Sequence, residues 1–375
     1  MYEFNEQTKA VVDLVHRLVA QHQMPLERRM LRGETLTLKD YEPGMLAAKA
    51  VGLWALRAPP QFDGAQLCLV DRLAVIEENS RCLTPLRFGG HTFQSLFALT
   101  GVQKERYLDP ILAGHKHWSF AQTEPGGGAD PARAVATTAR RDDQGWILNG
   151  SKIWITAFDE ADVVFVVART DKSAGIKGMS MFAVEKENPG LIAREVPMLG
   201  GMKTHQLTFD DCLVDDSSLL GAEGHGLEGA QIGLTSARFE VAASALGVAQ
   251  RAYEMMVSYA KDRVAFGGPL ADKQAVQTMV VDSWIELQQN RLMLYRCAER
   301  SDGDREMRIE AGLVKMQCTE MVGRILDRAI QVHGAAGCTY ESPLAWWYDR
   351  QRMARIYEGP TEVHKYRVLA RHLLS

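Results

Sequence analysis

The chain has 375 residues, of which 46% are hydrophobic and 24% charged, and its formal net charge is −4. This is the composition of an ordinary globular protein with room for two or three domains, which excludes a disordered chain. Acidic and basic residues are interspersed, so there is no basic field, and no run of about 18 apolar residues predicts a spanning helix. We therefore expect no nucleic-acid partner and no membrane partner.

The amino-terminal segment and the cysteines bear on location and metal binding. Charged residues such as Glu3, Glu6 and Asp13 interrupt the apolar residues near the start, which excludes a signal peptide. The six cysteines lie far apart without a C-x-x-C spacing, and no H-E-x-x-H occurs, so we expect buried free thiols and no metal site. The expected location is the cytoplasm of a bacterial-type cell, or the mitochondrial matrix if a presequence has been removed.

Residues 1–118 have the pattern of a helical domain. The apolar residues between Val11 and Leu18 follow the i, i+3, i+4, i+7 spacing of one helical face. The stretches 45–57 and 69–115 continue in the same style, rich in Leu and Ala and interrupted by turn-forming residues. We expect an amino-terminal α-helical domain over 1–118.

Residues 119–228 carry strand and turn signals. Glycines at 126–128 and the pair Asn149-Gly150, which is typical of a tight hairpin, separate short runs rich in Val, Ile, Thr and Trp. Runs with the length of buried strands lie at 163–167, 179–184 and 207–214. This pattern predicts a middle β domain over 119–228.

Residues 229–375 return to long helical patterns. Two apolar stripes are formed by Val276, Met279, Val280, Ser283, Trp284 and Leu287, and by Ile309, Leu313 and Met316. Faces this apolar are expected to be buried in a helical bundle, which is the third domain. An α–β–α order of this kind is compatible with many functions.

Two segments of the middle region carry groups suited to a ligand. In Phe120–Asp130 a hydroxyl and a carboxylate precede a glycine run that can bring backbone N–H groups close to a ligand, although a surface turn is the alternative. In Leu148–Thr156 a strand presents Trp154 and Thr156 on one face, which suits a flat ring with polar edges. A core Trp beside a strand-forming Thr is the alternative there.

A third segment, Arg355–His364, places Glu358 between an aromatic residue and a glycine, and the following Pro360 favours a new helix start. A carboxylate in an apolar pocket has a raised pKa, because desolvation disfavours its charged form, and it can then act as a proton acceptor. A solvated helix-capping Glu is the alternative, and it suits Glu362 better than Glu358.

Together the three segments resemble the acyl-CoA dehydrogenase family, over nearly the whole chain. The family pattern T-E-P-x-A-G-S-D is similar to Thr123–Asp130, N-G-x-K-x-W-I-T to Asn149–Thr156, and Y-E-G-T to Tyr357–Gly359. Further family marks are the segment 263–267 with Gln274 and the segment 331–335. The resemblance implies an α+β fold with an amino-terminal α-helical domain, a middle β-barrel or sandwich domain and a carboxy-terminal four-helix bundle.

The resemblance also implies FAD as the cofactor and assigns residues to it. The isoalloxazine ring would contact Gln122, Thr123, Ala129, Trp154 and Thr156. The ADP half of an FAD bound by a neighbouring subunit would contact Arg263, Phe266, Gln331 and Gly334, and Gln274, Thr361 and Glu362 are further expected cofactor contacts. A cofactor that spans a subunit interface implies a homotetramer, a dimer of dimers.

By the same resemblance, Glu358 is the catalytic base. It would remove the α-proton of an acyl-CoA while the β-hydride moves to flavin N5, giving a trans-2-enoyl-CoA, and electrons would pass to an electron-transfer flavoprotein. Some family branches carry the base on an earlier helix, one residue before an Arg, but that position here is Ala237, which cannot act as a base. Arg238, Tyr357 and Gly359 are the expected substrate contacts.

Three departures from the family pattern concern the substrate more than the reaction. Pro360 replaces the threonine of Y-E-G-T, which loses an FAD contact or passes it to Thr361, and Ala129 replaces a serine. The segment 199–209 is shorter than its family counterpart. These departures therefore indicate a variant branch of the family with the motif Y-E-G-P-T-E-V-H.

The same fold leaves other functions open. A flavin monooxygenase would lack a base at the Glu358 position, whereas a nitroalkane-oxidase-like enzyme would also use a carboxylate. A non-catalytic partner subunit or nucleic-acid-binding member would need a basic carboxy-terminal region, and the run 350–371 is only modestly basic. Acyl-chain length and the choice between CoA and a carrier-protein thioester do not follow from the motifs.

Overall fold

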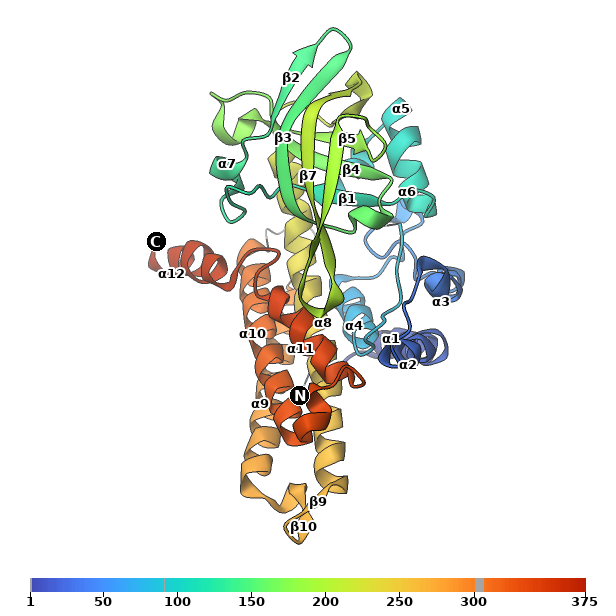
Figure 1. The fold of residues 1–375 in the computed structure, drawn as a ribbon, viewed down its shortest axis with the longest axis vertical. Coiled ribbons are helices and arrows are strands. Elements are labelled where there is room, and N and C mark those ends of the chain that lie inside the picture. The colour runs from blue at the N-terminus through green and yellow to red at the C-terminus, as the bar shows by residue number, and fades with distance from the viewer. Residues whose placement is uncertain (1, 91, 301–306) are drawn as a thin grey trace. The chain divides into compact units, whose positions relative to one another are not determined.

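The computed structural model describes residues 2–90, 92–300 and 307–375, except the side chains of Gly229, Gln231 and Ile232. The chain divides into two compact units (Figure 1). The helical unit comprises Met1–Leu53, Gln66–Phe88 and Thr235–Ser375, and the sheet unit comprises Trp54–Ala65 and Gly89–Leu234. Each unit has a hydrophobic core of its own.

The amino-terminal part of the helical unit contains α1 Glu6–Leu18, α2 Met24–Leu31, α3 Leu38–Ala50 and α4 Leu69–Asn79. A π-helical turn, Val19–Gln23, joins α1 to α2. Asn5 caps α1, because its side-chain oxygen accepts a hydrogen bond from the Thr8 backbone N–H at 2.8 Å. The helix predicted over Val11–Leu18 is confirmed, and Val15 and Leu18 form part of its buried face.

The rest of the helical unit is built from long helices that lie side by side (Figure 1). They are α8 Gly226–Asp262, whose first turns belong to the sheet unit, α9 Gln274–Glu299, α10 Arg308–His333 and α11 Pro343–Ala354, followed by the π-helical segment Val363–Leu369 and α12 Ala370–Leu374. Helix α10 packs against both α9 and α11. Val314, Met321 and Ile325 of α10 are fully buried in this core. Within the described residues, no helix combines the length and apolarity that a membrane crossing requires.

The α9 stripe is buried less completely than its sequence predicts. Ser283 and Leu287 are buried, but Trp284 is 43% exposed, so the prediction is wrong for that residue. Val281 and Ile285 on the same helix are exposed too. The periodicity identifies the apolar face of α9, but only part of that face has a partner within one chain.

The sheet unit contains one mixed sheet. Its strands are β1 Trp118–Ala121, β2 Thr138–Asp142, β3 Gly145–Thr156, β4 Val163–Arg169, β5 Met179–Glu185, β6 Leu191–Pro197, β7 Lys203–Val214 and β8 Leu219–Leu220. The order is β6-β7-β3-β2-β4-β5-β8, and β1 pairs in parallel with β4. The strands predicted at 163–167, 179–184 and 207–214 are confirmed as β4, β5 and β7. Burial is nearly complete in β4 and β5, but in β7 it is not, because Asp210, Asp211 and Leu213 are exposed.

Short helices accompany the sheet: α5 Gly101–Gln103, α6 Asp109–Ala113 and α7 Pro131–Ala134. The described residues between Ser80 and Thr100 contain no α-helix, only a 3-10 turn at Gln94–Ala98. The helical structure predicted for 69–115 is therefore wrong between Ser80 and Thr100. Leu96 and Phe93 are buried here without helical periodicity, because they pack into the core of the sheet unit.

Asn149-Gly150 does not form the predicted hairpin turn. The pair lies inside β3, at a shift of register against β7, and the turn between β2 and β3 is Asp143-Gln144. The Asn149 side chain bridges to Asp211 of β7 by two hydrogen bonds of 2.9 Å. Gly150 has φ +149°, and a Cβ there would lie 2.5 Å from the Thr137 hydroxyl. The residue types that favour a turn serve a β-bulge instead.

Candidate active site

The glycine-rich loop, residues 122–130, follows β1 and is anchored by a buried ion pair. Lys152 of β3 is 0% exposed, and its Nζ donates to Glu124 Oε1 at 2.7 Å and to the Gln122 carbonyl at 3.1 Å. The Glu124 carboxylate also accepts hydrogen bonds from the backbone N–H groups of residues 136–137, at 2.8 and 2.9 Å. These bonds tie the start of the loop to β3 and to the segment that precedes β2.

Burial and pairing act in opposite directions on the two pKa values. Burial lowers the pKa of Lys152 to about 8, and the hydrogen bond and charge of Glu124 oppose that change. Burial alone would raise the pKa of Glu124, but hydrogen bonding and the charge of Lys152 outweigh it and lower that pKa. At neutral pH both groups are ionised, so the loop is held by a charge-assisted bond.

Trp154 is presented to solvent by a bulge in β3. The register against β7 shifts between Lys152 and Ile155, and Trp154 has a positive φ of 62°. Its side chain is 50% exposed, Ile155 is buried and Thr156 is exposed. The Ile153 N–H donates to the Thr123 carbonyl at 2.9 Å, which joins the bulge to the glycine-rich loop.

The sheet unit therefore brings together the residues expected to hold a flavin ring. Gln122, Thr123 and Ala129 lie on one loop that is bonded to the strand carrying Trp154 and Thr156. The Oε1 atom of Gln122 is buried and accepts no hydrogen bond within the described residues. A half-exposed indole beside a buried acceptor without a donor suits a planar ligand with N–H groups at its edge, so these residues fit the expected cofactor.

In the helical unit, Glu358 lies in an irregular segment between α11 and the π-helical segment Val363–Leu369. Its φ is +55°, and that of Gly359 is +96°. Side chains from separate elements donate to the carbonyl groups here. Arg238 Nε donates to the Glu358 carbonyl at 2.9 Å, His364 Nε2 lies 3.1 Å from the same oxygen, and Lys315 Nζ donates to the Gly359 carbonyl at 2.7 Å.

The electrostatic surroundings of Glu358 differ from the apolar pocket expected from its sequence neighbours. Burial lowers the pKa of Arg238, and the charge of Glu358 partly offsets this. Burial lowers the pKa of Lys315 to about 8, again against the charge of Glu358. Glu358 as a residue is half-buried although its Oε2 atom is buried, and Tyr357 beside it is exposed. Two cations thus act on Glu358, and they favour its ionised form.

Thr361 and Glu362, the further expected cofactor contacts, start the helical turn after Pro360. The Thr361 hydroxyl donates to Glu320 Oε1 of α10 at 2.9 Å, and the same oxygen accepts from Arg355 Nε at 2.8 Å. Glu362 is exposed. Thr361 thus has a partner within the chain, and the roles of both residues toward a cofactor stay predictions.

The residues expected to bind FAD from a neighbouring subunit lie at the ends of α8, α9 and α10. Arg263, Gln274, Gln331 and Gly334 are all exposed. Phe266 lies between the two short strands Val264–Ala265 and Gly268–Pro269 and is 98% exposed. The rings of Tyr259 and His333 stack at 4.3 Å, which places the end of α8 beside the end of α10. These exposed residues are available to a ligand or a second subunit.

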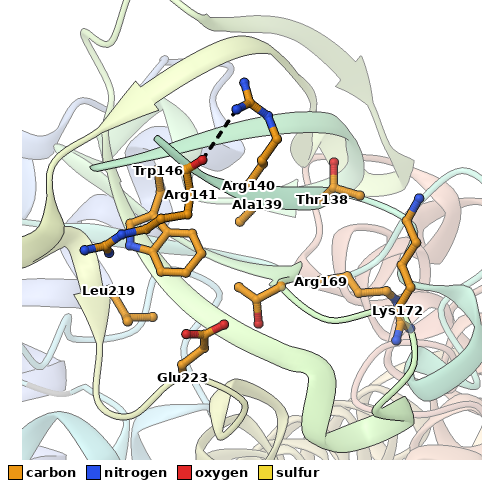
Figure 2. A pocket seen from close by; sticks show the side chains of 10 residues that line it. Thr138, Ala139, Arg140, Arg141, Trp146, Arg169, Lys172, Leu219 and Glu223 are labelled. Carbon is orange, nitrogen blue, oxygen red and sulfur yellow. Dashed lines mark hydrogen bonds between the residues drawn. The ribbon is translucent and has the colours of Figure 1, made fainter. Parts of the chain in front are cut away.

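Two other features of the sheet unit were not expected from the sequence. One is an open cavity of about 800 Å³ (Figure 2), lined by Thr138, Ala139, Arg140, Arg141, Trp146, Arg169, Thr170, Lys172, Leu219 and Glu223. Its arginines have acceptors within the chain. Arg141 pairs with Asp216 at 2.8 Å, and Arg169 donates to backbone carbonyls. These bonds account for Arg141 and Arg169 without a ligand.

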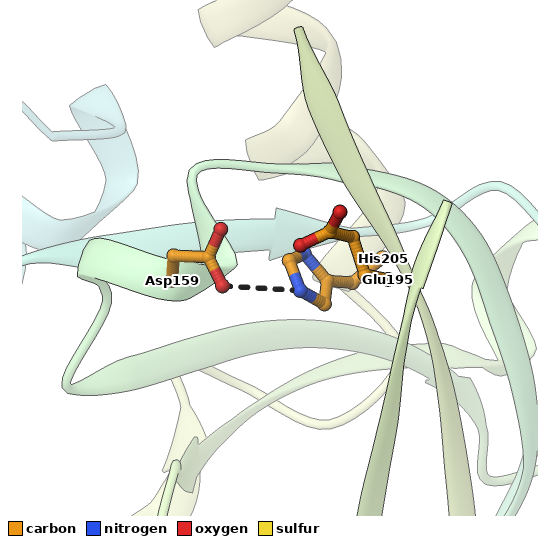
Figure 3. A group of neighbouring side chains, drawn as sticks. All are labelled: Asp159, Glu195 and His205. Atoms are coloured by element: carbon orange, nitrogen blue, oxygen red, sulfur yellow. Dashed lines mark ion pairs between the residues drawn. The ribbon is translucent and has the colours of Figure 1, made fainter. Parts of the chain in front are cut away.

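The other is a group formed by Asp159, Glu195 and His205 (Figure 3), whose potential ligand atoms lie within 4.8 Å of one another. His205 Nε2 lies 3.1 Å from Asp159 Oδ1, and Lys203 Nζ lies 2.7 Å from Glu195 Oε2. These contacts among the side chains account for the arrangement. The absence of a metal site stays a prediction.

The motifs alone did not assign structural roles to four residues. They are Lys152 and Glu124 at the glycine-rich loop, and Lys315 and His364 at the segment that carries Glu358. The available signal is a charged residue in an apolar setting. Lys315 stands between Val314 and Met316 on the apolar stripe of α10, where a solvated lysine would not fit.

Domain models of the acyl-CoA dehydrogenases match the chain almost from end to end. The amino-terminal, middle and carboxy-terminal domain models match residues 5–115, 119–212 and 224–374. Among curated proteins, (R)-benzylsuccinyl-CoA dehydrogenase of Thauera aromatica is 33% identical over 395 aligned positions, which cover 100% of this chain and 97% of that protein. The mitochondrial short-chain specific acyl-CoA dehydrogenase of Bos taurus is 36% identical over 334 positions, covering 87% and 81%.

The fold agrees with these matches. The solved structure of butyryl-CoA dehydrogenase from Megasphaera elsdenii superposes with a TM-score of 0.84 at 26% identity and covers 100% of both chains. The predicted architecture of a helical, a β and a second helical domain is confirmed. From the domain matches, the sequence identity and the residues of the two segments, we conclude that this chain belongs to the acyl-CoA dehydrogenase family of FAD-dependent oxidoreductases.

Proposed function

We propose that the protein catalyses the α,β-dehydrogenation of an acyl-CoA thioester to the trans-2-enoyl-CoA, with Glu358 as the base. The observation that carries this proposal is the setting of Glu358. The backbone carbonyls of Glu358 and Gly359 receive hydrogen bonds from Arg238, Lys315 and His364, so the carboxylate is carried by a segment with a defined geometry. A base must be held in this way to act on a weakly acidic C–H group.

In the proposed reaction the Glu358 carboxylate accepts the α-proton of the substrate. The backbone N–H of Glu358 polarises the thioester carbonyl, so that negative charge developing on its oxygen is stabilised. Arg238 and Lys315 favour the ionised carboxylate before the proton moves. Bound FAD supplies the acceptor for the hydride that leaves the β-carbon, and the two electrons left between the α- and β-carbons form the double bond.

The residues of the sheet unit would hold the flavin ring. Gln122, Thr123 and Ala129 supply the loop, and Trp154 and Thr156 supply the adjoining strand. The bulge that exposes half of the Trp154 indole supports this assignment, as does the buried Gln122 Oε1, which accepts no bond from the described residues. A flavin N–H group could donate to that oxygen.

A homotetramer, a dimer of dimers, is the proposed assembly. Phe266 at 98% exposure is an unusual position for an aromatic side chain unless a ligand or a partner subunit covers it. The exposed apolar residues Val281, Trp284 and Ile285 of α9 give a second copy an apolar face to pack against. Under this proposal Arg263, Phe266, Gln331 and Gly334 bind the ADP half of an FAD carried by a neighbouring subunit, and Gln274 is a further contact to that cofactor.

An electron-transfer flavoprotein is the proposed acceptor of the electrons. Its role is tested by adding such a protein to the substrate-reduced enzyme and following the return of oxidised flavin absorbance. Recovery that depends on its concentration is expected. Reoxidation by oxygen alone at the same rate would instead indicate an oxidase.

An anaerobic titration tests the proposed reaction. Acyl-CoAs of increasing chain length are expected to bleach the flavin absorbance of the purified protein, and nitroalkanes are expected to leave it unchanged. Glu358→Gln should retain FAD and slow bleaching by about 100-fold or more, because the neutral amide cannot accept the proton. Glu341→Gln, at an exposed position outside the site, is the matched control. Bleaching by nitroalkanes alone would overturn the proposal in favour of a nitroalkane-oxidase-like reaction.

A further inference from the structure

The segment that carries Glu358 has an unfavourable backbone conformation. Glu358 has a side chain and yet adopts a left-handed φ of +55°, and Gly359 follows at +96°. A side chain at φ near +55° is strained, so surrounding bonds must hold the residue there. Those bonds come from side chains outside the segment.

Lys315 supplies the shortest of these bonds. It is 0% exposed, its neighbours on α10 are apolar, and its Nζ donates to the Gly359 carbonyl at 2.7 Å. A buried ammonium group is costly unless it is hydrogen-bonded or paired. The hydrogen bond of Lys315 is made to the segment that carries Glu358. Glu358 is also the carboxylate whose charge acts most strongly on Lys315.

His364 supplies a second bond, and its chemical form can be deduced. A carbonyl oxygen only accepts hydrogen bonds, so the His364 Nε2 atom, 3.1 Å from the Glu358 carbonyl, must carry the proton. Its Nδ1 atom is buried and has no hydrogen-bond partner among the described residues. Burial, followed by the charges of Arg238 and Lys315, lowers the pKa of this imidazole to about 4. His364 is thus a neutral donor at neutral pH.

Two glycines make room for this imidazole. A Cβ at Gly312 of α10 would lie 3.0 Å from His364 Nδ1, and a Cβ at Gly359 would lie 2.8 Å from its Nε2. The ring therefore lies closely between α10 and the segment that it supports. Lys315 is on the same helix as Gly312, so the two donors approach the segment from neighbouring elements.

We propose that Lys315 and His364 are positioning residues that, together with Arg238, hold the Glu358–Gly359 backbone in one conformation and orient the catalytic carboxylate. Lys315 also keeps a positive charge beside the ionised base. This inference rests on the proposed role of Glu358 as the base. It assigns a function to a buried lysine and a buried histidine that do not touch the reacting atoms.

The test compares Lys315→Met, Lys315→Arg and His364→Gln with the wild-type holoenzyme, and uses Lys177→Met, at an exposed position in the sheet unit, as the matched control. Lys315→Met is expected to keep its flavin and to lose about 10- to 100-fold in kcat, because a misdirected base lowers the rate without weakening substrate binding. KM should stay within about threefold. The acid limb of its pH–rate profile should move to higher pH, because a cation that favours the ionised carboxylate is gone. Lys315→Arg should recover part of the rate and of the shift.

These readouts separate the proposal from a purely structural role. Lys315→Met with bound flavin, wild-type kcat and an unchanged acid limb would overturn it. So would a variant that loses stability and flavin but keeps its rate per bound flavin. If the wild-type protein fails to bleach with any acyl-CoA, the proposed function itself is wrong.

A second readout needs no activity. Nitrogen NMR of the histidine-labelled protein should contain one imidazole, absent in His364→Gln, that is protonated on Nε2 and stays neutral down to a pKa of about 4. An imidazole of His364 that titrates near pH 6.5, the ordinary histidine value, or carries its proton on Nδ1, would contradict the proposed bond to Glu358.

Discussion

Lys152 in the sheet unit and Lys315 in the helical unit are both fully buried, and burial lowers the pKa of each to about 8. Lys152 is paired with the Glu124 carboxylate at 2.7 Å, and that carboxylate is bonded to two backbone N–H groups. Lys315 instead donates to a neutral carbonyl, that of Gly359. The charge of Lys152 is therefore neutralised by the Glu124 carboxylate to which it is bonded. The charge of Lys315 acts on Glu358 instead.

The difference indicates two uses of the same side chain. A buried lysine with a dedicated carboxylate joins a loop to a strand, and its contribution is to stability and to the shape of the glycine-rich loop. A buried lysine whose hydrogen bond goes to a carbonyl can hold a backbone segment and still exert its charge on a nearby functional group. The same substitution at the two positions should therefore have different consequences.

The largest effect is expected for Lys152→Met. It leaves the Glu124 carboxylate buried without its counter-charge, which should cost about 3–5 kcal/mol in the free energy of unfolding. Urea denaturation measures this loss, and the flavin absorbance of the purified variant should fall because the loop of Gln122 and Thr123 loses its anchor. The double variant Lys152→Met/Glu124→Gln should regain part of the stability. Unchanged stability with full flavin content would contradict the structural role of the pair.

A smaller effect is expected for Gly359→Ala. The added Cβ meets His364 Nε2 at 2.8 Å, and alanine is strained at φ +96°. The cost should be about 1–3 kcal/mol in unfolding free energy, with a fall in kcat larger than the change in KM. Gly33→Ala is a useful comparison, because Gly33 also has a positive φ, +86°, but no atom lies within 4 Å of the added carbon. Equal kinetic effects in both variants would argue against a specific contact with His364.

Lys315→Met should be milder than Lys152→Met in stability. Methionine fills a similar volume on the apolar stripe of α10, and the loss is one hydrogen bond to the Gly359 carbonyl, about 1–2 kcal/mol. The rate should fall more clearly than the stability does. If Lys315→Met unfolded as readily as Lys152→Met, the distinction between the two lysines would disappear.

The smallest effect is a pH dependence due to His364. Its pKa is about 4 in the folded protein and near 6.5 when unfolded, so between pH 6.5 and pH 4 the unfolded chain binds more protons. Stability should therefore fall as the pH is lowered through this window, by at most about 1.4 kcal/mol for each pH unit. Thermal unfolding of wild type and His364→Gln at several pH values measures it. The same pH slope in both proteins would assign the effect to other groups.

Local patterns are sufficient to predict much of the fold. The period of α1 and the uninterrupted apolar runs of β4 and β5 determine their type, because each element buries one face or both. The hairpin turn predicted at Asn149-Gly150 is wrong because a bulge and a hairpin turn favour the same residue types, and only the pairing with β7 distinguishes them. The exposure of Trp284 could not be predicted, since an apolar stripe does not reveal whether its partner lies in the same chain.

The candidate site, like the fold, can be predicted from the sequence only in part. Motif resemblance identifies Glu358, Trp154 and the glycine-rich loop. It does not identify Lys315, which is 44 positions away from the carbonyl that it binds and reaches it only because α10 packs beside that segment. His364 lies near Glu358 in sequence, but its role depends on the space left by Gly312, which no local pattern contains.

The most direct test of the central claim, that Glu358 removes the α-proton, is the rate of anaerobic flavin bleaching with an acyl-CoA deuterated at the α-carbon. The wild-type holoenzyme should bleach more slowly with this substrate than with the undeuterated one, and Glu358→Gln should retain FAD and bleach at least about 100-fold more slowly than wild type with either. Equal rates for both substrates together with wild-type bleaching in Glu358→Gln would contradict the account.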